Sequence, residues 1–72
     1  MQEYNYSCLL GKMKERGYTQ EKLAKELGIS ATSLNFSLNN KRNFKQDEMI
    51  KAAQLLGISQ RELPKYFFTK QL

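Results

Sequence analysis

Residues 19–42 read TQEKLAKELGISATSLNFSLNNKR and contain two short helical patterns joined by Gly-Ile-Ser. Gly28 tolerates a positive φ without a Cβ penalty, so it suits a sharp turn between two helices that meet at a large angle. Thr19 and Ser30 each stand directly before one of the two patterns, where a hydroxyl caps the first turn of a helix. The spacing therefore predicts a helix-turn-helix over residues 20–39.

Apolar residues recur at helical spacing on both sides of this turn. The inner face of the first helix, over about 20–27, is expected to hold Leu23, Ala24 and Leu27. The second helix begins at Ala31, and its inward stripe is expected to be Ala31, Leu34 and Leu38. The small side chain of Ala24 allows the two helices to approach closely.

Three more helices are expected outside this stretch. The first ends before Gly17 and buries Tyr6, Leu9, Leu10 and Met13. Another spans about 46–56 with Met49, Ile50, Ala53 and Leu56 inward, and it stops at Gly57. The last begins at the Ser59 and Glu62 capping-box pair and is short or kinked because of Pro64. Residues 39–45 are expected to form a loop pinned by Phe44, and no segment shows strand alternation, so the fold class is all-α.

Length and composition limit the function. A chain of 72 residues makes one domain, residues 1–72, and its 12 Lys and Arg against 7 Asp and Glu give a net charge of +5 that favours anionic partners. One cysteine, Cys8, and no histidine leave no metal cluster and no imidazole base, so no enzyme activity, cofactor or metal is expected. Without a membrane-length apolar run or a signal peptide, the expected location is the cytoplasm.

Eight residues in order and spacing resemble the Cro/cI-type (XRE-like) family: Gln20, Leu23, Ala24, Leu27, Gly28, Ile29, Ser30 and Leu34. The resemblance covers roughly residues 9–58 and implies a compact five-helix, lambda repressor-like DNA-binding domain. Such proteins bind operator DNA, usually as dimers, with the third helix in the major groove. This chain has Ser37 where the family usually has an apolar residue, which leaves a rotated end of that helix as an alternative. It also has Asn40 where the family often has glycine, and asparagine tolerates left-handed geometry.

The candidate binding residues lie on and around the second helix of the motif. They are Gln20, Ala31, Thr32, Ser33, Asn35, Phe36, Asn39, Lys41 and Arg42. Asn35 suits a bidentate contact with adenine, and Phe36 suits a thymine methyl group or a protein partner. The resemblance assigns Gln20 to a phosphate, and Lys41 and Arg42 follow the helix where they would neutralise phosphates.

Each assignment has a local alternative. Thr32 and Ser33 also suit hydrogen bonds to nearby backbone, Asn39 suits the end of the helix, and cations in a loop are commonly only solvated. An exposed Phe36 needs a cover, which DNA, the tail or another protein would supply.

Two functions follow from these patterns. The first is a sequence-specific, phage-encoded transcriptional regulator of Cro/repressor type that binds double-stranded operator DNA in a lysis/lysogeny switch. The alternative is an antirepressor or co-repressor that docks on a co-encoded phage repressor through its helix-turn-helix surface. The alternative is based on a reading helix that lacks Arg and Lys but exposes Phe36. The aromatic tail, residues 64–72, contains Tyr66, Phe67 and Phe68, which serve either to close the core or to form a homodimer.

Overall fold

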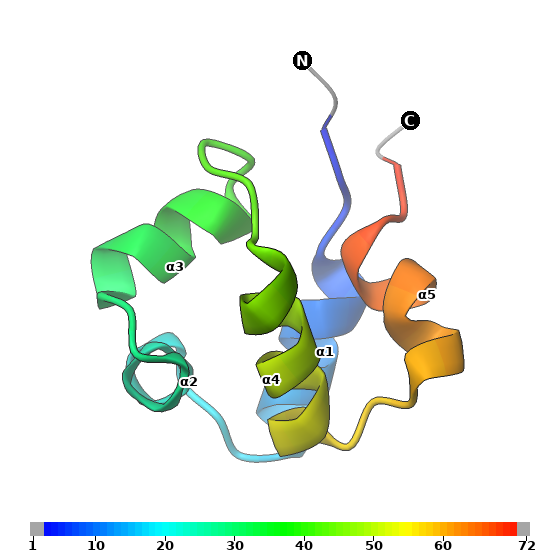
Figure 1. Cartoon of the computed structure of the whole chain (residues 1–72), viewed down its shortest axis with the longest axis horizontal. Helices are drawn as coiled ribbons and strands as arrows, with labels where there is room; N and C mark the ends of the chain where they lie inside the picture. The colour runs from blue at the N-terminus through cyan, green and yellow to red at the C-terminus, as the bar shows by residue number, and fades with distance from the viewer. Residues whose placement is uncertain (1–2, 71–72) are drawn as a thin grey trace.

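Six helical segments follow one another along residues 3–70, the part of the chain that this computed structural model describes (Figure 1). They are α1 (Ser7–Glu15), α2 (Gln20–Leu27), α3 (Ala31–Leu38), α4 (Gln46–Leu56), the 3₁₀ turn η1 (Gln60–Glu62) and α5 (Leu63–Phe67). Within residues 3–70 no β-strand forms, and Tyr4 and Lys70 make an isolated antiparallel bridge. The all-α, five-helix prediction is confirmed. Residues 1, 2, 71 and 72, which belong to the predicted domain and tail, lie outside the described residues.

The caps around the central turn form as the sequence predicts. The Oγ1 atom of Thr19 accepts a hydrogen bond from the Lys22 amide at 3.1 Å. The Oγ atom of Ser30 accepts one from the Ser33 amide at 3.0 Å. Gly28 ends α2 in the left-handed region, with a φ of 76°. These local bonds set the start of α2 and α3 and the bend between them.

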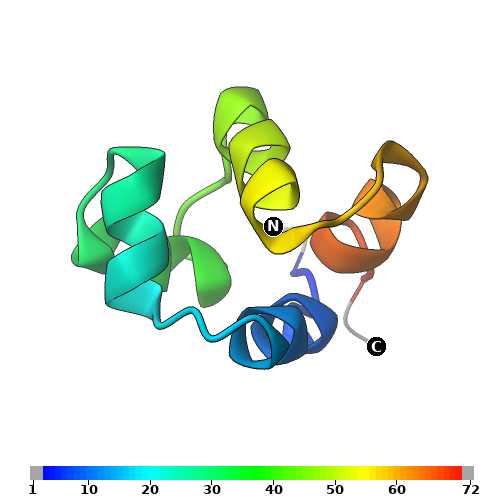
Figure 2. The same cartoon turned by 90° about the horizontal axis from the view of Figure 1, so that it is seen from below.

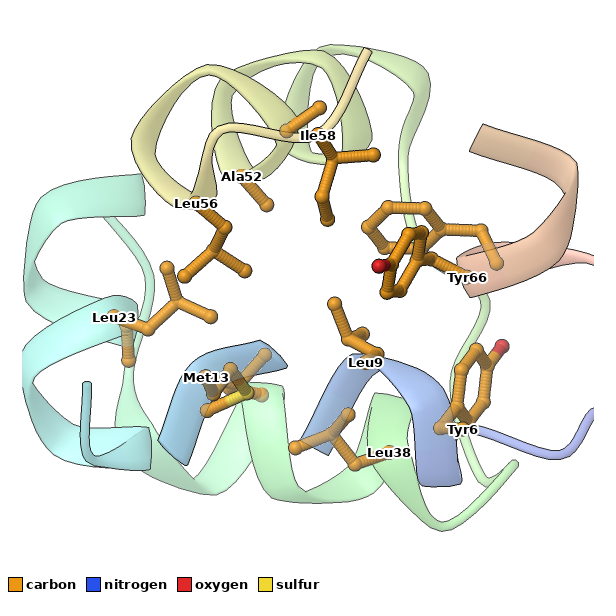
Figure 3. Close-up of a cluster of buried hydrophobic side chains, with 13 residues drawn as sticks. Tyr6, Leu9, Met13, Leu23, Leu38, Ala52, Leu56, Ile58 and Tyr66 are labelled. Atoms are coloured by element: carbon orange, nitrogen blue, oxygen red, sulfur yellow. The ribbon is translucent and has the colours of Figure 1, made fainter. Parts of the chain in front are cut away.

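The core lies where all five α-helices meet. Figure 3 shows its side chains, and the largest fully buried apolar ones are Leu9, Leu23, Leu34, Leu56 and Phe67. Helix α1 packs against α5, and α2 packs against both α3 and α4 (Figure 2). The helix-turn-helix is therefore held against the rest of the domain by α4.

Three residues expected to face inward are exposed instead. The relative exposures of Leu10 and Ile50 are 41% and 44%, and Ala31 is also exposed. Leu10 and Ile50 lie at the margins of their apolar stripes, and α4 buries Ala52 in addition to Ala53 and Leu56. On α3 the buried residues are Leu34, Ser37 and Leu38, so the inclusion of Ser37 turns Ala31 toward solvent.

Aromatic residues close the end of the core where the segments around Tyr4 and Phe68 meet. The ring of Phe44 packs edge-on against Tyr6 at 5.4 Å and Phe67 at 5.3 Å between centroids. Tyr66 and Phe67 are buried, whereas Phe68 is 47% exposed. The tail therefore closes the core and also presents one aromatic outward. A homodimer through Phe68 stays a prediction.

The loop after α3 is fixed by Asn40, which has a φ of 63°. Its Oδ1 accepts a hydrogen bond from the Tyr4 amide at 2.8 Å, and its Nδ2 donates to the Tyr4 carbonyl at 2.9 Å. This side chain attaches the N-terminal segment to the end of α3. The tolerance for left-handed geometry expected of asparagine is used here.

Asn40→Ala is expected to lower the free energy of unfolding by about 2 kcal/mol, because it removes both hydrogen bonds and leaves a Cβ residue at positive φ. Asn40→Gly removes the same bonds without the backbone strain, so its loss should be about 1 kcal/mol. Urea denaturation followed by circular dichroism measures both. Equal losses in the two variants would mean that backbone strain contributes nothing at this position.

Candidate functional site

The outward face of α3 is uncharged. Its exposed residues are Ala31, Thr32, Asn35, Phe36 and Asn39, and Ser33 is half-buried at its edge. Phe36 has 45% of its surface exposed, which makes it one of the large apolar residues most open to solvent in the described chain. The face thus combines hydroxyl and amide groups with one aromatic ring. We refer to these six residues as the α3 face.

An amide pair joins the α3 face to the start of α2. The Nδ2 atom of Asn35 donates a hydrogen bond to Oε1 of Gln20 at 3.2 Å. This bond leaves the Gln20 Nε2 protons and the Asn35 Oδ1 atom to engage a ligand. The structure therefore brings together two predicted site residues that are fifteen positions apart.

Two other predicted site residues make local bonds. The Oγ atom of Ser33 accepts a hydrogen bond from Oγ of Ser30 at 2.9 Å. The Nδ2 atom of Asn39 donates to the Asn35 carbonyl at the end of α3, at 2.8 Å. The Asn39 side chain thus bonds at the end of the helix, as its local alternative expected, whereas the Ser33 hydroxyl bonds to a neighbouring side chain and not to backbone. Thr32, Asn35 and Phe36, the residues predicted to read bases, are all exposed on this face.

The sequence predicted that Arg42 would offer its guanidinium to a ligand beside α3. In the structure the guanidinium is bonded to residues of the fold instead. Its Nη1 donates to Oγ of Ser37 at 2.7 Å and to Oε1 of Glu48 at 3.0 Å, and its Nη2 donates to Oε2 of Glu48 at 2.7 Å. The Lys45 amide also donates to Oε1 of Glu48, at 2.9 Å. Glu48 is 5% exposed and Ser37 is 0% exposed. We call Ser37, Arg42 and Glu48 the Arg42 brace.

The Arg42 brace also fixes the orientation of the C-terminal end of α3. The helix continues to Leu38 with Ser37 and Leu38 both buried, so the end is not rotated. The polar residue at position 37 is accommodated because its hydroxyl meets a guanidinium rather than an apolar neighbour. Sequence reasoning missed Ser37 and Glu48 as partners of Arg42.

Electrostatics keep both ends of the ion pair charged. The Arg42 guanidinium is the main cause that holds the pKa of the Glu48 carboxyl below its ordinary value of 4.5. The bond to Glu48 in turn raises the pKa of Arg42. The charges of Arg42 and Glu48 cancel each other. Lys41 and Lys45 are the other cations in the loop after α3, and both are exposed. The Lys41 amide donates to the Phe36 carbonyl at 2.8 Å, so Lys41 follows the α3 face closely in space.

The helix-turn-helix with an uncharged outward face occurs in a chain that belongs to a named family. Residues 2–70 match the family described as "Protein of unknown function (DUF739)", and the chain is a member of it. The chain is also similar to the solution structure of the modulator of repression (MOR) of the temperate bacteriophage TP901-1 from Lactococcus lactis. The two are 42% identical, with a TM-score of 0.76, over 90% of this chain and 88% of that chain.

No curated protein matches the chain. Among residues 3–70, no helix combines the length and the apolar character needed to cross a membrane.

Proposed function

We propose that this protein modulates a phage repressor by binding to it directly, with the α3 face as the docking surface. The observation that carries the proposal is the 42% identity to a phage modulator of repression across nearly the whole of both chains. The nature of the α3 face supports the same function. Exposed aromatic residues surrounded by polar groups are common anchors of protein interfaces.

The charge distribution argues for a protein partner rather than for DNA as the ligand of α3. Affinity for DNA comes largely from cations that neutralise phosphates. The described α3 contains no charged residue, and the guanidinium of Arg42 is bonded to Glu48 and Ser37. Arg42, one of the two cations expected to neutralise phosphates, is therefore bonded within the fold, whereas Lys41 is exposed.

Docking gives a direct mechanism for modulation. A partner that covers the DNA-reading helix of a repressor competes with the operator for the same surface. Phe36 would supply the central apolar contact, and Gln20 and Asn35 would supply amide groups at a fixed separation. Repressor occupied in this way is expected to leave its operator or to bind it with altered affinity.

A second candidate is direct operator binding by a Cro-like regulator of the XRE-like family. The net charge of +5 favours it, and so does the position of Gln20 in the first turn of α2, where helix amides suit a phosphate. In that case Asn35 and Phe36 would read bases, and Lys41 would contact the backbone.

One titration separates the two functions. The purified protein is mixed with DNA from the neighbouring promoter region at several salt concentrations, with and without the repressor encoded in the same genome. A modulator changes the gel shift of the repressor and gives no specific shift alone. A specific shift by this protein alone that weakens steeply with salt would instead establish the Cro-like function and overturn the proposal.

A further inference from the structure

A groove with a volume of about 360 Å³ adjoins the end of α3. It lies between the N-terminal segment, the start of α1 and the residues that follow α3. Its lining includes Glu3, Tyr6, Leu10, Leu38, Asn39 and Asn40. Leu10 is 41% exposed, whereas Leu38 and Tyr6 are nearly buried, so Leu10 supplies the main apolar surface of a groove whose lining is otherwise largely polar.

The groove contains one negative charge within a chain whose net charge is +5. Glu3 is the only charged residue among the described residues that line it. Leu38 and Asn39, at the C-terminal end of α3, also line the groove, and the last turn of that helix contains no basic residue. A helix C-terminus carries a partial negative charge, which adds to that of the carboxylate. The groove therefore suits a cation.

We propose that this groove receives a lysine or arginine side chain from the DNA-binding surface of the repressor. The inference deepens the proposed function and rests on it. The aliphatic stem of such a side chain would lie against Leu10 and Leu38, and its charged head would reach the Glu3 carboxylate. Long cationic side chains commonly bury their stems in this way while the charge finds a partner.

The cations on the DNA-binding surface of a repressor explain why a modulator would need a negatively charged groove. A DNA-binding surface carries cations for phosphates, and covering it with an uncharged face would leave those cations desolvated and unpaired. The α3 face offers no carboxylate, but the groove beside it does. A carboxylate at the rim of an interface also speeds association and fixes orientation.

The groove is continuous with the α3 face. Asn39 belongs to both, and the bonds between Asn40 and the Tyr4 backbone hold the N-terminal segment against the end of α3. The docking surface is thereby extended from α3 onto the exposed side of α1. One partner would contact both parts at once.

The test measures the dissociation constant of the full chain for the repressor by calorimetry at two salt concentrations. Glu3→Gln and Leu10→Ala should each weaken binding by about 3- to 10-fold, and Glu3→Gln should also reduce the salt dependence. Glu15→Gln and Ile50→Ala are the matched controls. Glu15 is an exposed acid of α1 paired with Lys12, and Ile50 is as exposed as Leu10 but lies on α4. The controls should change the constant by less than about 2-fold.

The outcomes distinguish this inference from the function on which it rests. If the unmodified protein does not bind the repressor, both are overturned. If it binds and Phe36→Ala weakens binding, but the Glu3 and Leu10 variants behave like their controls, the groove proposal alone is wrong. A thermal melt of each variant confirms that it is folded, as expected for substitutions of exposed residues.

Discussion

Arg42→Ala is expected to lower the free energy of unfolding by about 2–3 kcal/mol. The substitution removes three hydrogen bonds and leaves the Glu48 carboxylate, which is 5% exposed, without its counter-charge. For a domain of this size that is a large part of the total stability. Urea denaturation at neutral pH measures the loss. Lys41→Ala is the matched control, since it removes an exposed cation from the adjacent position and should have almost no effect. Equal losses in the two variants would contradict a structural role for Arg42.

The same variant should alter the dependence of stability on pH. The pKa of Glu48 is lowered in the folded protein, chiefly by Arg42, from an ordinary value of 4.5. A lowered carboxyl pKa stabilises the fold above the unfolded value, and this stabilisation is lost as pH falls through the folded pKa. The difference in stability between the unmodified protein and Arg42→Ala should therefore be largest above pH 4.5 and should narrow below it. Denaturation curves between neutral and acidic pH would reveal a constant difference if the ion pair were unimportant.

Phe36→Ala is expected to weaken binding to the repressor by at least about 30-fold, which corresponds to roughly 2 kcal/mol and is typical of an aromatic anchor at the centre of an interface. Its stability should change little, because the ring is 45% exposed in the free protein. Calorimetric titration of the repressor measures the affinity.

Phe68→Ala is the control for that variant, because Phe68 is a 47% exposed phenylalanine on the tail rather than on α3. It should leave repressor affinity unchanged. If Phe36→Ala binds the repressor as tightly as the unmodified protein, the α3 face is not the docking surface. If the protein reads DNA instead, the same substitution should weaken preference at one thymine and leave other positions intact.

The sequence predicted the helices well where their limits depend on neighbouring residues. The bounds of α2 and α4 agree with the prediction because Thr19, Gly28 and Gly57 act within one turn of the helix ends. The capping pair of Ser59 and Glu62 also forms. Such interactions are encoded in a few consecutive residues, so a single sequence is enough to locate them.

Burial was predicted less well, because it depends on contacts between distant elements. Periodicity alone placed Leu10 and Ile50 inside and overlooked Ser37. A serine becomes a core residue only when a partner reaches its hydroxyl, and that partner comes from the next loop. The outward position of Thr32, Asn35 and Phe36 was predictable, since it follows from the face that Leu34 and Leu38 bury. The hydrogen bonds of Arg42 could not be predicted, because the sequence around a loop cation does not indicate which residues its side chain will contact.

The hydroxyl at position 37 also helps to determine which cations of the neighbouring loop remain available at the surface. It accepts a hydrogen bond from Nη1 of Arg42, while Glu48 binds both terminal nitrogens of the same guanidinium. The positive charge of Arg42 is thus neutralised next to the core, and the exposed positive charge of residues 39–45 comes from Lys41 and Lys45.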